Sequence, residues 1–278
     1  MIAIALALAL TAPDKVDVRP GADLAVGAVA LVGVVVPALF QKQLAPVHCR
    51  ICDGPDNTGL PGTGARGSLN GADAWFHDAT AGWLVSRETA DVLSNVLAYA
   101  VVPAGAFASA LTATGPHASD GAGWRAASII EQSAIVSSAL VQTVKLVTAR
   151  KRPFVRYGTG ETSGSYDVSD FGSYSGFPSG HTAWVTSLAV GTATTLTLEE
   201  SSAAPWAWGA AAAASITAAS LRMMAEKHYF TDVAAGALIG GACGVIMPLL
   251  HRRNGPLSSS SSRSGVAPAP ALAMSGTF

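Results

Sequence analysis

Residues 177–184, FPSGHTAW, are of types that suit the binding of an anion at the start of a helix. Pro178 and Gly180 favour a tight turn, and Ser179 stands just before a long apolar run. Backbone N–H groups at a helix start, with the positive end of the helix dipole, can hold an anion. Gly180 would let that anion approach the backbone closely. Taken alone, Ser179 is more typical of a helix N-cap, and His181 of a polar residue at a membrane edge.

A second polar stretch, HYFTD, supplies a histidine and an aspartate at helical spacing. His228 and Asp232 stand at i and i+4, so on a helix they share one face and can form a hydrogen bond. A carboxylate that holds one imidazole nitrogen fixes the tautomer and leaves the other nitrogen free to attack. Arg222 precedes the pair closely. We expect Glu226 and Lys227 to be solvated loop charges on other faces.

A third stretch, KLVTARKRPF at residues 145–154, is rich in cations. Lys145 lies most of two helical turns before Arg152, inside an apolar run, where an ammonium group is costly unless a polar or anionic group meets it. Pro153 ends the helix. For Arg150 and Lys151 we expect ordinary anchors whose charged ends reach the lipid headgroups.

Long apolar segments must position these residues. The chain has 278 residues, of which half are apolar and 13% are charged, whereas soluble domains carry roughly 25% charged residues. Six apolar runs are about long enough to cross a hydrocarbon core as helices. They cover residues 22–40, 90–113, 126–147, 182–198, 206–224 and 233–250. We therefore predict an all-α membrane bundle of about six spans, with a soluble bundle of Ala-rich helices as the alternative.

Six crossings in order would place all three polar stretches on one face of the membrane. The cations, the anion-binding turn and the two histidines would then meet at one site. Phosphoryl transfer needs this combination, because it depends on positioning and on stabilisation of negative charge. Fixed cations and backbone donors can supply both without a metal ion. The net charge of −1 argues against a protein that binds nucleic acid.

The three stretches resemble the signature of the type 2 phosphatidic acid phosphatase superfamily, which includes bacterial acid phosphatases and vanadium haloperoxidases. The family pattern K-x(6)-R-P matches residues 145–153, P-S-G-H matches residues 178–181, and S-R-x(5)-H-x(3)-D matches residues 221–232. Leu221 stands where the family usually has serine. This departure affects a secondary hydrogen bond and not the reaction. The resemblance covers residues 126–250.

The resemblance implies a metal-independent membrane phosphatase with the helical fold of that superfamily and no cofactor. It implies that His228 is the nucleophile that forms a phosphohistidine, that Asp232 orients it, and that His181 protonates the leaving oxygen. The residues that it assigns to the phosphoryl oxygens are Lys145, Arg152, Ser179, Gly180 and Arg222. The expected substrate is a lipid phosphate monoester or a polyprenyl diphosphate. A vanadate-dependent haloperoxidase and a non-catalytic transport or structural membrane protein remain as alternatives.

The rest of the chain suggests its organisation. Residues 1–12 have the apolar core of a signal peptide without its positive n-region. Residues 22–250 form the predicted membrane domain, residues 53–71 a Gly- and Pro-rich loop outside the bilayer, and residues 255–278 a disordered Ser-rich tail. Cys49 and Cys52 favour a local disulfide over a metal site completed by His48 and Asp53, because adjacent residues rarely converge tetrahedrally. Cys243 is expected to be a small buried apolar residue.

Two further expectations concern the last apolar run. Gly236, Gly240 and Gly244 repeat every four residues there, which predicts close packing against a neighbouring helix. Basic residues follow the run directly, which suits a cytoplasmic end. We therefore expect an integral protein of a bacterial cell membrane whose catalytic face points to the periplasm, where a disulfide could form. A cleaved signal peptide would predict the opposite arrangement.

Overall fold

The computed structural model describes residues 16–44, 50, 69–112, 122–160 and 171–252. The possible signal peptide at residues 1–12, the tail at residues 255–278, most of the loop at residues 53–71, and the segment with His48, Cys49 and Cys52 lie outside these residues. In the described part the chain forms helices and no β-strand, which confirms the all-α prediction. One isolated β-bridge joins Val16 to Arg252.

Helices occupy all six predicted apolar runs. Five long helices are α2 (Pro20–Leu39), α7 (Ala122–Thr148), α9 (Gly180–Leu198), α10 (Ala204–Met224) and α11 (Phe230–Leu250). The remaining run is filled by α5 (Arg87–Val96), the π-helical turn η2 (Leu97–Val101) and α6 (Val102–Thr112), which follow one another without a break. The short elements are α3 (Gln41–Leu44), α4 (Gly71–Thr80), α8 (Pro153–Arg156) and the 3-10 turn η5 (Phe171–Tyr174).

Among the described helices, three are long and apolar enough to cross a membrane: Pro20–Leu39, Arg87–Thr112 and Phe230–Leu250. The prediction of six spans is therefore not confirmed, although six long helical segments are present. The helices that fall short are α7, α9 and α10. Charged side chains within α7 and the many Ser and Thr residues of α9 lower their mean hydropathy.

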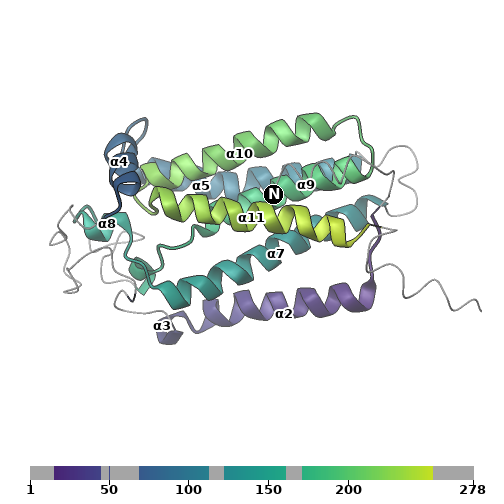
Figure 1. Ribbon diagram of the computed structural model, residues 1–278, viewed down its shortest axis with the longest axis horizontal. Helices are drawn as coiled ribbons and strands as arrows, with labels where there is room; N and C mark the ends of the chain where they lie inside the picture. Colours follow the sequence, from purple (N-terminus) through teal and green to yellow (C-terminus); the bar gives the residue numbers. More distant parts are fainter. Residues whose placement is uncertain (1–15, 45–49, 51–68, 113–121, 161–170, 253–278) are drawn as a thin grey trace, which may run out of the picture.

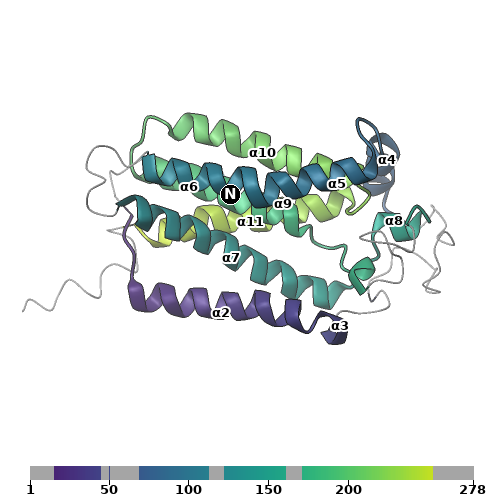
Figure 2. The same ribbon diagram turned by 180° about the vertical axis from the view of Figure 1, so that it is seen from behind.

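The long helices run side by side along the longest axis of the molecule (Figure 1). The central helix is α9, which packs against α11, α10, α7 and α6. Helix α2 packs against α7 at the edge of the bundle. From behind, α5 and α6 follow each other in line along the bundle (Figure 2). Buried apolar residues of α6, α7 and α9, including Ala110, Ile130 and Leu188, form one core cluster between these helices.

The glycine-rich face of α11 is the contact surface for α9. A Cβ atom on Gly240 would collide with the carbonyl oxygen of Ala183, and one on Gly244 would lie 2.9 Å from the carbonyl oxygen of Ser187. These backbones approach so closely because neither glycine carries a side chain. The predicted close packing of the last helix is confirmed, and its partner is α9.

The antiparallel order of the long helices gives the bundle two different ends. At one end, α4 and α8 lie next to the end of α7 and the starts of α9 and α11 (Figure 1). At the other end, Nε2 of His251 lies 2.8 Å from a carboxylate oxygen of Asp23, so the end of α11 is tied to the start of α2. The three polar stretches predicted from the sequence all fall at the end that carries α4 and α8.

Candidate active site

The turn before α9 joins two of the polar stretches. Ser179 is buried, and its side chain caps α9 by accepting a hydrogen bond from the backbone N–H of Thr182 at 3.4 Å. Its own N–H donates to the carbonyl oxygen of Asp232 at 2.9 Å. Ser179 is therefore an N-cap, and the turn is fixed to the first turn of α11. Lys145 at the end of α7 reaches the same place, because its Nζ lies 3.4 Å from the position of a Cβ on Gly180.

His228 lies in the linker between α10 and α11 and is 2% exposed. Its Nδ1 lies 2.6 Å from the carbonyl oxygen of Gly176. A carbonyl can only accept, so Nδ1 carries the hydrogen and Nε2 carries the lone pair. The nearest oxygen of Asp232 lies 3.7 Å from Nδ1. The sequence analysis missed Gly176, and the expected hydrogen bond between His228 and Asp232 is not formed.

The carboxylate of Asp232 is directed to other donors. One oxygen accepts a hydrogen bond from the backbone N–H of Tyr229 at 2.8 Å, and the other pairs with Arg150 at 2.5 Å. Asp232 therefore caps the start of α11 as part of a capping box. It still stands close enough to His228 to act on the imidazole through its charge.

His181 stands in the first turn of α9 and is held from α5 and η2. Its Nε2 lies 2.7 Å from Oδ1 of Asn95, and the edge of its ring faces Tyr99 with ring centroids 5.2 Å apart. The sequence analysis did not single out Asn95. A polar amide inside an otherwise apolar run was the available signal, because such residues usually face the interior of a bundle.

Fixed contacts orient two of the predicted phosphate ligands. Arg222 at the end of α10 is buried, and its NH1 donates to Asp91 at 2.5 Å and to Ser94 at 3.0 Å, both on α5. Arg152 donates from Nε to the carbonyl oxygen of Gly172 at 2.9 Å. Through these contacts, α5 and the η5 turn also become part of the site.

The field of the cations acts on both histidines. Burial lowers the pKa of His181 to about 2, and Arg222, Lys145 and Arg152 act in the same direction. Burial also lowers the pKa of His228 well below its ordinary value, assisted by the same three cations. The predicted phosphate ligands and the two histidines thus share one electrostatic environment. With these lowered pKa values, both imidazoles are neutral near pH 7.

Arg150 and Lys151 are not headgroup anchors, so that prediction was wrong. Both are buried. The guanidinium of Arg150 pairs with Asp232 at 2.5 Å and with Asp73 of α4 at 2.7 Å. The chain turns after α7 at Ala149, which has a φ of 46°. This turn directs Arg150 toward α4 and the start of α11.

Glu226 and Lys227 are not solvated loop charges either. They are 5% and 3% exposed, because α4 and α8 cover the linker between α10 and α11. Nζ of Lys227 lies 3.8 Å from Asp91 and 5.0 Å from the centre of the Phe154 ring. A carboxylate oxygen of Glu226 lies 3.4 Å from Nε2 of His77 on α4.

Within the described residues, no group of three or more His, Cys, Asp and Glu side chains is arranged to hold a metal ion. Cys243 is buried, as predicted.

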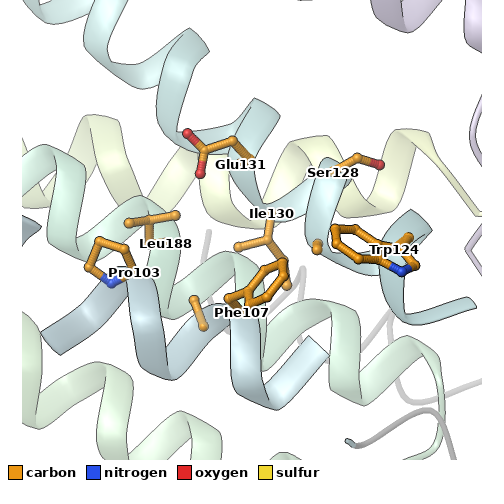
Figure 3. A pocket seen from close by; sticks show the side chains of 9 residues that line it. Pro103, Phe107, Trp124, Ser128, Ile130, Glu131 and Leu188 are labelled. Carbon is orange, nitrogen blue, oxygen red and sulfur yellow. The ribbon is translucent and has the colours of Figure 1, made fainter. Parts of the chain in front are cut away.

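A pocket of about 350 Å³ lies between α6, α7 and α9 (Figure 3), and its lining is apolar except for Ser128 and Glu131 of α7. Pro103 and Phe107 line one wall, Trp124 and Ile130 line the other, and Leu188 of α9 also contributes. None of the eight candidate site residues lines this pocket, whose outer wall includes the exposed side chains of Phe107 and Trp124.

Comparison with known proteins matches one region of the chain to a family. Residues 127–256 match the family model of the PAP2 superfamily. The matched region includes all eight predicted site residues, together with Arg150 and Gly176. No curated protein and no solved structure matches the chain.

Proposed function

We propose, from the premise that residues 127–256 belong to the PAP2 superfamily, that this protein is a metal-independent membrane phosphatase. Its proposed substrate is a lipid phosphate monoester or a polyprenyl diphosphate, and its proposed intermediate is a phosphohistidine. The superfamily supports a phosphatase-like or haloperoxidase-like activity, and the three apolar helices support a membrane protein. The observation that carries the proposal is the buried His228, with Nε2 unprotonated, beside an anion-binding helix start and three cations.

In the proposed first step, Nε2 of His228 attacks the phosphorus atom and the bond to the leaving oxygen breaks. The imidazole gains positive charge as the new bond forms. The carbonyl dipole of Gly176 at 2.6 Å and the carboxylate of Asp232 at 3.7 Å both stabilise that charge.

Three cations and the start of α9 would hold the phosphoryl oxygens. The first N–H groups of a helix have no acceptor within the helix, so those of Gly180 and His181 are suited to the phosphate. The side chain of Ser179 already satisfies the N–H of Thr182. The cations assigned to the other oxygens are Lys145, Arg152 and Arg222, whose charges all act on His181. Such fixed charges stabilise the transition state without reorganisation.

His181 would supply the proton to the leaving oxygen and later accept one from the attacking water. Its pKa is about 2, so His181 is a neutral imidazole near pH 7 and must take up a second proton before it can act as an acid. The negative charge of a bound phosphate raises the pKa of a nearby imidazole. The proton can therefore enter with the substrate and pass to His181 as the phosphate binds.

Location and apolar surface support a lipid substrate. The site lies at the end of the bundle where α2 ends and α11 begins, and these are two of the three helices apolar enough to span a membrane. The pocket between α6, α7 and α9 (Figure 3) reaches Leu188, which lies about two helical turns from His181 on the same helix. We infer that an alkyl chain extending from the phosphate along α9 would meet the apolar side chains of this pocket.

The test is phosphate release by the purified protein, in excess chelator, from phosphatidate, a polyprenyl diphosphate and a soluble phosphomonoester. We expect kcat/KM for at least one lipid substrate to exceed that for the soluble ester by about tenfold or more, which corresponds to about 1.4 kcal/mol. Activity lost in chelator and restored by a divalent cation would contradict the metal-free mechanism. Vanadate-dependent halide oxidation without phosphate release would assign the site to the haloperoxidases instead.

A further inference from the structure

We propose that Arg150, held in place by Asp73, is a positioning residue that orients Asp232 and the linker carrying His228. This inference rests on the phosphatase function proposed above. It assigns a role in the reaction to a side chain of α4 and to a cation between the two motif residues Lys145 and Arg152.

Arg150 bridges two carboxylates that are completely buried. Its NH1 donates to Asp232 at 2.5 Å, and its NH2 donates to Asp73 at 2.7 Å. Both aspartates are 0% exposed. Its guanidinium also lies over the ring of Tyr229, with 4.5 Å between Cζ and the ring centre. A planar guanidinium with fixed donors on both sides defines the orientation of each partner.

Asp73 connects α4 to the first turn of α11. Its two carboxylate oxygens accept hydrogen bonds from the backbone N–H of Thr231 at 2.8 Å and from the Thr231 hydroxyl at 2.7 Å. Asp73 therefore supplies a negative charge at the start of α11, where the helix dipole favours it. The rings of Phe76 and Phe230 stack with centroids 4.1 Å apart and hold the two helices together.

The connection reaches the proposed nucleophile through Asp232. One oxygen of Asp232 is paired with Arg150, which leaves the other to accept from the N–H of Tyr229 and to stand 3.7 Å from Nδ1 of His228. Without Arg150, the carboxylate would be free to rotate or to pair directly with the imidazole. Either change would move the linker between α10 and α11.

The contacts of Arg150 also distinguish it from the proposed phosphate ligands. Two buried carboxylates face its guanidinium, and each of its terminal nitrogens pairs with one of them. A phosphate would have to compete with these two carboxylates for the guanidinium. Removing Arg150 should therefore change the rate of the reaction more than the binding of an inorganic anion.

The experiment compares Arg150→Met, Arg150→Lys and Asp73→Asn with the wild type in membranes or detergent. Arg125→Met is the matched control, because Arg125 lies in the first turn of α7 at the opposite end of the bundle. For each protein the measurements are kcat, the inhibition constant of inorganic phosphate, and the unfolding temperature.

We expect Arg150→Met to lower kcat by about tenfold or more while the phosphate inhibition constant stays within about threefold. Arg150→Lys should recover part of kcat, since an ammonium group can pair with one of the two carboxylates. Asp73→Asn should lower kcat less than Arg150→Met, and Arg125→Met should leave it unchanged.

Other results would overturn the inference. A folded Arg150→Met protein with normal kcat would show that Asp232 needs no positioning. An inhibition constant that rises in parallel with the loss of kcat would make Arg150 a phosphate ligand. If a variant has a lowered unfolding temperature but a normal kcat when assayed well below that temperature, the network is purely structural. If Arg150→Met does not fold, a normal kcat of folded Asp73→Asn decides against the inference. A wild-type protein that releases no phosphate would instead contradict the proposed phosphatase function, and the role of Arg150 would fall with it.

Discussion

The carbonyl oxygen of Gly176 accepts a hydrogen bond from Nδ1 of His228 over 2.6 Å. The backbone fixes this carbonyl, because the N–H of Gly176 donates to the carbonyl oxygen of Arg150 at 2.8 Å. The tautomer of the proposed nucleophile is thus set by the main chain between η5 and α9. The carboxylate of Asp232, four residues later, lies 3.7 Å from the same nitrogen and does not make the hydrogen bond that its spacing suggested.

Gly176→Ala should therefore reduce activity without removing any side chain of the site. A Cβ atom at this position would lie 2.9 Å from the carbonyl oxygen of Arg150, so the segment must shift and its own carbonyl with it. We expect kcat to fall by about tenfold, in the range of a lost orienting contact. Gly71→Ala is the matched control, since a Cβ on Gly71 meets nothing within 4 Å. Equal activity of the two variants would mean that the Gly176 carbonyl does not orient His228.

Removing each histidine should have a different effect on the covalent intermediate. His228→Ala should lower turnover by at least about a thousandfold and abolish the phosphoenzyme, because no nucleophile remains. Acid-labile phosphate on purified His228→Ala protein after incubation with radiolabelled substrate would contradict the assignment.

His181→Ala should slow turnover by about a hundredfold, which is typical of a lost general acid. The loss should be smaller for a substrate with a good leaving group, and phosphohistidine should accumulate if its hydrolysis also needs His181. Comparison of a nitrophenyl and an alkyl phosphate tests this. An equal loss for both substrates would mean that His181 does not protonate the leaving oxygen.

The pH profile should reflect the depressed pKa values of the two histidines. Both imidazoles stay neutral at every pH above their lowered pKa values, so neither takes up a proton near pH 6.5. A phosphate monoester takes up its second proton near about pH 6, and this proton can serve the leaving oxygen. We expect kcat/KM for a soluble monoester to rise as the pH falls through about 6 and then to level off. An acid limb near pH 6.5 would mean that His228 is protonated at its ordinary pKa.

The sequence was sufficient for the helices and for the positions of the eight predicted residues at one end of the bundle. Apolar runs predict helices reliably because a buried or lipid-facing helix must be apolar over its whole length. The run at residues 182–198 became α9, Gly180–Leu198. The runs did not determine how many helices cross a membrane, because α7, α9 and α10 include polar residues on buried faces.

The charges around the site could not be predicted from local patterns. Arg150, Glu226 and Lys227 were interpreted as exposed because each lies in a polar stretch next to an apolar run. Their partners stand on α4 and α5, far earlier in the chain: Asp73 for Arg150 and Asp91 for Lys227. No periodicity links residues so distant in sequence, so only the packing of α4 and α5 against α10 and α11 reveals these pairs.

Close packing of α11 against α9 predicts a severe effect of a large side chain on folding. Gly240→Leu would force the two backbones apart, since even a Cβ atom collides with the carbonyl oxygen of Ala183. We expect a loss of about 3 kcal/mol or more, or no folded protein. Gly209→Leu on α10 is the control, because a Cβ on Gly209 meets nothing within 4 Å. Thermal unfolding in detergent measures both, and a normal Gly240→Leu protein would contradict the close contact.

The orientation of the bundle in the membrane can be predicted from its basic residues, once the buried ones are set aside. The lysine and arginines that we propose as phosphate ligands would be retained for the reaction and not for membrane insertion, so we leave them out of the count under the positive-inside rule. Arg150, Lys151 and Lys227 are also buried at the catalytic end, and they leave this count as well. The basic residues directly after α11 then decide the count, and they indicate that this end of the bundle is cytoplasmic. We therefore expect the catalytic end to face the periplasm.

Two single cysteines in a background without the three native ones test this orientation with an impermeant thiol reagent. Ala79→Cys lies exposed on α4 at the catalytic end, and Ala203→Cys lies exposed before α10 at the opposite end. We expect labelling of Ala79→Cys on intact cells and of Ala203→Cys only after lysis. Because the two sites lie at opposite ends of one bundle, the reverse pattern would place the active site in the cytoplasm. Labelling of both sites on intact cells would mean that the bundle does not cross the membrane.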